Sequence, residues 1–201
     1  MLWAMRPKPI RFNPALEPIS QGLPNAIAES VGRTIARHSY LEWVLGQILY
    51  SLLEISIKQG RKVVQRPEPA QYVAAVQGLF AFHKLETRFN FATLCRKVEA
   101  ADRARDALAH SVYMRDVNQR GTKVYLVRGS WARGLEFESV SRDLWPEAPL
   151  LDRAFLGRLR DDVEDAVARA EKLRDLTDKL LRKLHDMRRT TPGLNRRRGE
   201  R

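Results

Sequence analysis

The segment Phe91–Tyr113, FATLCRKVEAADRARDALAHSVY, combines a helical apolar pattern with the most informative polar residues of the chain. Side chains three or four positions apart lie on the same face of a helix. One face of this segment then carries Phe91, Leu94, Cys95, Val98, Ala101, Arg105, Leu108 and Val112. The pattern predicts a helix that continues to residue 112 and places Arg105 on a mainly apolar face.

Two further helices are predicted upstream. A long apolar stripe follows Asn25, a residue that favours helix starts, and continues to Ile55. Its second half is apolar nearly all round, so it must be covered within a bundle or by a second subunit. A second helix is predicted over residues 72–83, after a basic connection that ends in prolines at 59–69.

The pattern changes downstream of the segment. Alternating residues at 123–128 (KVYLVR) and 135–140 (LEFESV) predict a small β-hairpin over about 123–140. A final stripe over 151–187 predicts one long C-terminal helix. The fold class is therefore predicted to be mainly α, with the hairpin inserted before that helix.

The two ends of the chain differ from the middle. Residues 1–24 contain five prolines and predict an extended arm. Residues 25–187 are predicted to form a single helical domain. Residues 188–201 predict a basic, disordered tail that could contact phosphates, through Arg188, Arg189, Arg196, Arg197 and Arg198.

Composition limits the classes of function. The formal net charge of +12 in 201 residues, with a pI near 10.3, favours polyanionic partners, nucleic acid above all. Cys95 is the single cysteine, and no apolar run is long enough for a membrane span. No signal peptide is recognisable. We therefore expect a soluble, cytoplasmic protein without a membrane partner.

Common catalytic motifs are missing from the sequence. It contains no Walker A loop, GxGxxG, GxSxG or HExxH motif. Four scattered histidines and one cysteine make a transition-metal site unexpected. Any chemistry is therefore expected from histidine, arginine and carboxylates, with no cofactor.

Those residue types gather in Asp102–Tyr113, DRARDALAHSVY. On a continuous helix Asp102, Asp106 and His110 stack along one line, so that Asp106 can accept a hydrogen bond from the His110 ring. Arg105, five residues before His110, would lie about 140° around the helix from it. The two side chains are then expected to point to different sides, unless the helix kinks or a second copy supplies partners.

The hexapeptide Arg105-Asp106-Ala107-Leu108-Ala109-His110 resembles the R-x4-6-H signature of the HEPN superfamily (higher eukaryotes and prokaryotes nucleotide-binding). A polar residue directly after the arginine is common in that family, and Asp106 fits this pattern. Tyr113 lies three places after the histidine, whereas HEPN toxins often have a tyrosine two places after it. The resemblance implies an up-and-down helical bundle that dimerises with two motif helices facing each other.

The resemblance also implies an activity. HEPN ribonucleases cleave RNA without a metal ion, and the ribose 2′-hydroxyl attacks the adjacent phosphorus. His110 would move protons, Arg105 would hold the developing negative charge and Asp106 would complete the catalytic set. Supporting roles would fall to Asp102, Ser111, Tyr113 and Glu42. The implied setting is a toxin or phage-defence component with an antitoxin or a nucleotidyltransferase as partner.

Two alternatives stay open at the level of sequence. A second R-x4-H match, from Arg33 to His38, is followed by Ser39 and Tyr40, although His38 lies mid-helix on an apolar stripe, as a core histidine would. The protein could also be a non-catalytic helical dimer, with Arg105 and His110 in structural roles, that serves as a regulatory or nucleic-acid-binding module.

Overall fold

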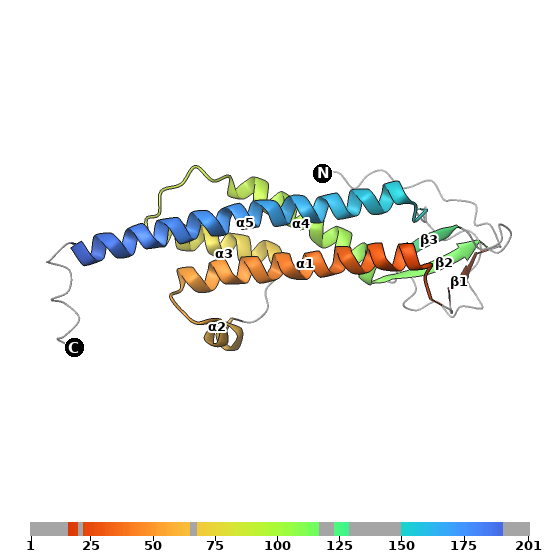
Figure 1. Cartoon of the computed structure of the whole chain (residues 1–201), viewed down its shortest axis with the longest axis horizontal. Helices are drawn as coiled ribbons and strands as arrows, with labels where there is room; N and C mark the ends of the chain where they lie inside the picture. The colour runs from red at the N-terminus through yellow and green to blue at the C-terminus, as the bar shows by residue number, and fades with distance from the viewer. Residues whose placement is uncertain (1–15, 20–21, 65–67, 117–122, 129–149, 191–201) are drawn as a thin grey trace, which may run out of the picture. The chain divides into compact units, whose positions relative to one another are not determined.

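The computed structural model describes residues 16–19, 22–64, 68–116, 123–128 and 150–190. Its elements are β1 (Leu16–Pro18), α1 (Asn25–Leu52), α2 (Ile57–Val63), α3 (Pro69–Phe82), α4 (Phe91–Ala109), β2 (Ser111–Asp116), β3 (Val124–Arg128) and α5 (Arg153–Thr190) (Figure 1). The prediction of a mainly helical chain with a small sheet before a long C-terminal helix is confirmed.

Side chains at the first turns explain where the helices begin. The Asn90 side-chain oxygen accepts a hydrogen bond from the Thr93 amide at 2.9 Å, at the start of α4. The Asp152 carboxylate accepts one from the Phe155 amide at 2.7 Å, at the start of α5. Each contact satisfies an amide that has no partner within the helix.

The prediction of a connection without a helix over residues 59–69 is wrong in its first part, because residues up to Val63 belong to α2. Ser56 accepts from the Gln59 amide at 3.3 Å, and the Gln59 side chain accepts from the Ser56 amide at 2.9 Å. This reciprocal arrangement is a capping box. The spacing Ser56-x-x-Gln59 was thus a readable signal for a helix start.

The sheet differs from the predicted hairpin. Strand β2 is central, with β1 and β3 antiparallel on either side of it. Ser111 pairs with Arg128, and Leu16 pairs with Asp116. Strand β3 lies within residues 123–128, where a strand was predicted. Its partner is β2. Residues 135–140, the predicted partner strand, lie outside the described residues.

Strand β1 corrects the prediction that residues 1–24 form an arm without packed structure. Residues 16–18 are extended, as expected, but they form an edge strand of the sheet. Pro18 is compatible with this position, because proline lacks an amide donor and is tolerated at sheet edges. Residues 1–15 lie outside the described residues.

The chain divides into two compact units, and α1, α4 and α5 contribute residues to both. The first unit comprises residues 1–37 and 101–163. Its core is an apolar cluster drawn from helices and strands, with Val31, Leu108, Val124, Leu126, Leu151 and Leu156 buried. Leu108 is 1% exposed, so the end of α4 is anchored in this core. The grouping of residues 25–187 into a single domain stays a prediction.

The second unit comprises residues 38–100 and 164–201. Its buried side chains come from α1, α3, α4 and α5, and include Leu41, Leu45, Ile48, Val73, Val76, Leu94, Val98 and Leu173. Polar contacts add to this packing: the Tyr40 hydroxyl donates to Glu171 at 2.8 Å, and Lys97 pairs with Asp165 at 2.7 Å. Most apolar side chains in the second half of the first predicted helix are thus buried, whereas Trp43 is 44% exposed and Leu53 is 40% exposed.

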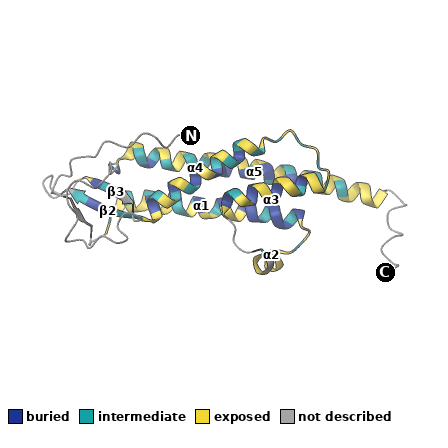
Figure 2. Cartoon of the chain, turned by 180° about the vertical axis from the view of Figure 1, so that it is seen from behind, coloured by how far each residue is buried: buried dark blue, intermediate teal, exposed yellow. Residues whose placement is uncertain are grey.

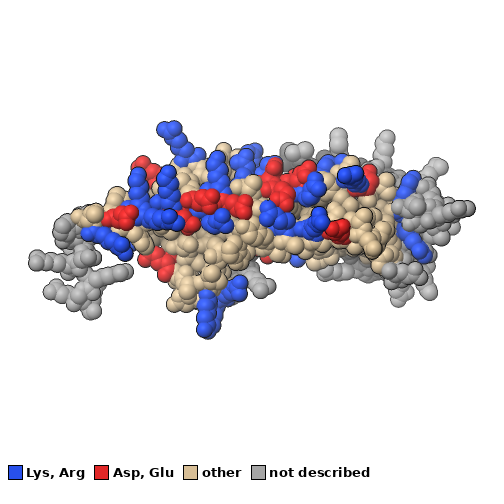
Figure 3. Space-filling view, in the orientation of Figure 1, with Lys and Arg blue, Asp and Glu red and all other residues tan. Residues whose placement is uncertain are grey.

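Helix α5 changes character along its length. Residues 163–173 include several that are fully buried, whereas residues 186–190 are all exposed (Figure 2). Lys and Arg side chains alternate with Asp and Glu over its outer surface (Figure 3). The mixture of signs is typical of a solvated helix face.

The boundary of the predicted tail is wrong by one turn. Arg188 and Arg189 belong to α5, and Arg188 pairs with Glu54 at 3.2 Å. Arg196, Arg197 and Arg198 lie outside the described residues. No helix in the described parts of the chain is both long and apolar enough to cross a membrane.

Candidate functional site

The polar residues of the predicted motif lie where α4 passes into β2. Arg105 and Asp106 are in the last turns of α4, and His110 follows its final residue, Ala109. The His110 amide still donates to the Asp106 carbonyl at 3.0 Å, and Ser111 then begins β2. The predicted continuation of this helix to residue 112 is therefore wrong, because residues 111–116 leave it to form the central strand.

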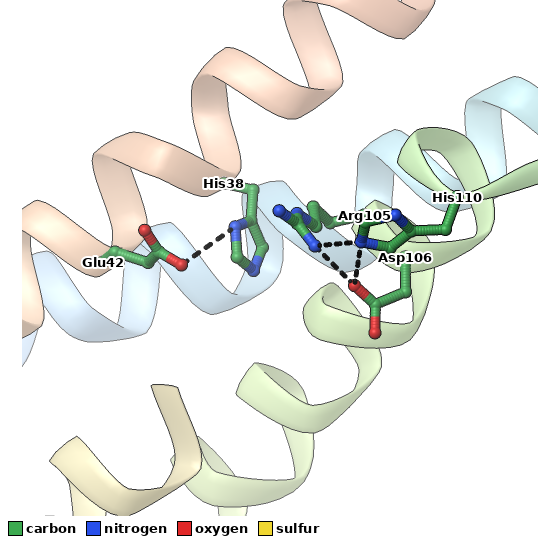
Figure 4. Close-up of polar contacts among 5 residues, drawn as sticks. All are labelled: His38, Glu42, Arg105, Asp106 and His110. Atoms are coloured by element: carbon green, nitrogen blue, oxygen red, sulfur yellow. Dashed lines mark hydrogen bonds and ion pairs between the residues drawn. The ribbon is translucent and has the colours of Figure 1, made fainter. Parts of the chain in front are cut away.

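The side chains of Arg105 and His110 meet at this junction. The Arg105 Nη1 atom lies 2.9 Å from His110 Nε2 and 2.8 Å from Asp106 Oδ1, and Figure 4 shows the three side chains turned toward one another. The expectation that Arg105 and His110 point to different sides is wrong. It assumed that His110 is helical, whereas the chain changes direction at that residue.

The contact between Arg105 and His110 fixes the direction of the hydrogen bond. A guanidinium nitrogen can only donate, so a hydrogen bond at this contact requires His110 Nε2 to accept with its lone pair. Asp106 Oδ1 lies 3.9 Å from His110 Nε2, too far for a hydrogen bond. The predicted bond from the His110 ring to Asp106 is therefore replaced by the bond from Arg105.

The three side chains are accessible from solvent. Their exposed fractions are 38% for Arg105, 62% for Asp106 and 63% for His110. Arg105 is thus partly buried, as its place on the apolar face predicted, whereas most of the Asp106 and His110 side-chain surface is exposed.

Tyr113 holds the junction through its hydroxyl group. The Tyr113 hydroxyl donates to the backbone carbonyl of Leu108, which closes the C-terminal end of α4 against β2. Burial raises the pKa of this hydroxyl above its ordinary value. Ser111 Oγ is shielded from solvent and has no hydrogen-bond partner among the described residues. Tyr113 therefore positions the turn that carries His110, a role that its spacing from the histidine did not indicate.

We expect Tyr113→Phe to lower the free energy of unfolding by about 1 kcal/mol near pH 8, because the Leu108 carbonyl loses its donor. The raised pKa means that the unfolded state releases the phenolic proton before the folded state does. The contribution is thus complete below about pH 10, the ordinary tyrosine value, and is lost as pH rises through the folded pKa. Urea unfolding of parent and variant at pH 8 and above pH 10 checks this, and an equal difference at both pH values would contradict it.

Asp102 and Glu42 are the remaining predicted residues. Asp102 is one turn before Asp106 on α4 and is half-buried. Glu42 pairs with His38, one turn earlier on α1, with Nδ1 and Oε1 3.8 Å apart (Figure 4).

The alternative pair from Arg33 to His38 does not share an exposed surface. His38 is buried, with 3% of its surface exposed, as a core histidine would be. Arg33 is 76% exposed at its side chain and pairs with Glu29. The structure thus brings an arginine and a histidine together at the surface in the Arg105–His110 pair.

No protein-family model, curated protein sequence or solved structure matches this chain. In the described part of the chain, no group of three histidine, cysteine or acidic side chains is placed to hold a metal ion.

Proposed function

We propose that this protein is a HEPN-type endoribonuclease that cleaves RNA without a metal ion. The observation that carries the proposal is the 2.9 Å contact between Arg105 Nη1 and His110 Nε2 at an exposed helix–strand junction. It joins a permanent positive charge to an imidazole, the side chain that proteins use most often as a general acid or base.

The two side chains supply complementary parts of the reaction. The 2′-oxygen bonds to phosphorus, its proton passes to an imidazole, and the bond from phosphorus to the 5′-oxygen breaks. The 5′-oxygen takes up a proton, and the other product ends in a 2′,3′-cyclic phosphate. Arg105 stabilises the negative charge that develops on the phosphoryl oxygens, a contribution of about 3–4 kcal/mol for one well-placed donor.

A homodimer would complete the site. In the proposed arrangement two copies place their Arg105 and His110 side chains on one scissile phosphate. One imidazole then accepts the 2′-hydroxyl proton while His110 of the partner subunit protonates the leaving oxygen. With one imidazole as the base and the other as the acid, both proton transfers can occur in the same step.

The proposal is tested by incubating the purified protein with single-stranded RNA in EDTA. We expect cleavage that leaves 2′,3′-cyclic phosphate ends and that disappears when the RNA carries 2′-O-methyl groups. RNA that stays intact, or products with a 3′-hydroxyl, would reject the mechanism. The biological setting that we propose, a toxin or phage-defence component, would then be tested by growth arrest on expression.

A further inference from the structure

The Arg105 guanidinium is already occupied in the described structure. Its Nη1 atom donates to Asp106 Oδ1 at 2.8 Å and to His110 Nε2 at 2.9 Å. Asp106 Oδ1 also lies 3.9 Å from His110 Nε2. A negatively charged oxygen therefore stands beside both the guanidinium and the imidazole, where a phosphate oxygen contacting both residues would have to bind.

We propose that Asp106 is a displaceable carboxylate that occupies the phosphate position on Arg105 until a phosphodiester replaces it. The inference rests on the proposed function for its substrate class. It changes the role of Asp106 from a catalytic partner of His110 to an intramolecular competitor of the substrate.

The chemistry of the two ligands supports an exchange. Carboxylate and phosphate oxygens both accept short, charge-assisted hydrogen bonds from arginine. A carboxylate left in place would repel an incoming phosphodiester, since both are negatively charged. Asp106 is 62% exposed, so its carboxylate can turn into water, and exposed ion pairs of this kind are worth little in free energy.

Displacement would also prepare the imidazole. While Arg105 donates to Nε2, the lone pair of that nitrogen is engaged. When the guanidinium turns to a phosphate, the lone pair becomes available to accept the 2′-hydroxyl proton. Binding of the substrate phosphate and release of the base are thereby coupled through one side chain.

The test measures binding of a labelled 2′-O-methyl RNA oligonucleotide, which cannot undergo attack by the 2′-oxygen. We expect Asp106→Asn to bind this probe about two- to fivefold more tightly than the parent, as the loss of one exposed ion pair implies. The matched control is Asp161→Asn on α5. Asp161 also directly follows an arginine that it pairs with, Arg160 at 3.3 Å, and the substitution removes the same charge.

A second pair of variants separates competition for Arg105 from a general charge effect. In the Arg105→Ala background, Asp106→Asn should give no more tightening than Asp161→Asn does, because there is no guanidinium to release. A gain that persists without Arg105, a gain matched by Asp161→Asn, or no binding by either the parent or Asp106→Asn would overturn the inference. Equal thermal unfolding curves show that the variants are folded.

Failure of the proposed function is distinguishable from failure of this inference. The binding comparison needs no cleavage, so a parent that leaves RNA intact while Asp106→Asn gains affinity through Arg105 rejects the nuclease and keeps the displaceable carboxylate. A parent that cleaves RNA while Asp106→Asn gains no affinity keeps the nuclease and rejects the carboxylate role.

Discussion

His110→Ala is expected to slow RNA cleavage about 10²- to 10⁴-fold, the usual contribution of a positioned acid–base group. The loss should appear in the rate of the bound complex, because Arg105 stays available to hold the phosphate. Initial rates with saturating and with limiting RNA separate an effect on the rate of the bound complex from an effect on substrate binding. Arg105→Ala should slow cleavage to a similar extent and also weaken binding of the substrate.

The control for this prediction is His185→Ala. His185 lies on α5, is 54% exposed and is 3.9 Å from Glu54, so it resembles His110 in exposure and in having an acidic neighbour. It should leave the rate within about twofold of the parent, since surface substitutions away from special features have small effects. Equal losses in His110→Ala and His185→Ala, or cleavage that survives in His110→Ala, would show that the activity comes from elsewhere.

Gly60→Ala is expected to destabilise the protein by about 1–3 kcal/mol, the range for an added methyl group in a filled site. Gly60 is buried on α2, and a Cβ at this position would approach Tyr50 Cγ to 2.7 Å. Tyr50 is itself only 8% exposed, so its ring has little room to move. Urea or thermal unfolding measures the change.

Gly78→Ala is the matched control for this substitution. Gly78 is exposed on α3, and a Cβ there meets no described atom within 4 Å. Replacing it with alanine should stabilise the helix by about 0.5–1 kcal/mol, because glycine loses more conformational freedom on folding. Stabilisation of similar size by both substitutions would mean that α2 does not pack against Tyr50.

Helices with a single clear periodicity could be predicted from the sequence. The apolar stripes predicted α1, α3 and α5 with ends within about three residues of the observed ones, because burial of one face dictates the 3.6-residue spacing. The end of α4 could not be located in this way. Val112 fits the apolar face of a continued helix and equally fits an alternating strand from Ser111 to Asp116.

The sheet depended on contacts that periodicity does not report. Strand β1 lies almost a hundred residues before β2 in the sequence, and its three residues are too few to show an alternating pattern. The capping box that begins α2 was present in the sequence, but the nearby prolines and basic residues favoured a loop. Local patterns thus predicted the helices, whereas strand partners required the folded structure.

The candidate site was predicted in its composition but not in its geometry. Arg105, Asp106 and His110 were selected from their types and spacing, and the structure places them in contact. The prediction separated Arg105 from His110 because it assumed a continuous helix, in which every residue adds the same rotation about the axis. The contact exists because the helix ends at Ala109, and that end depends on the Tyr113 hydroxyl and on pairing of β2 with its neighbours.

The position of β1 has a consequence for shortened forms of this protein. Three residues near the start of the chain cover one side of the strand that follows His110. A polypeptide that begins after Pro18 leaves the amides and carbonyls along that side of β2 without these partners, and an open strand edge readily recruits another chain. Trimming the amino terminus would therefore favour self-association through β2 and disturb the backbone next to the histidine, although no residue of the site had been removed.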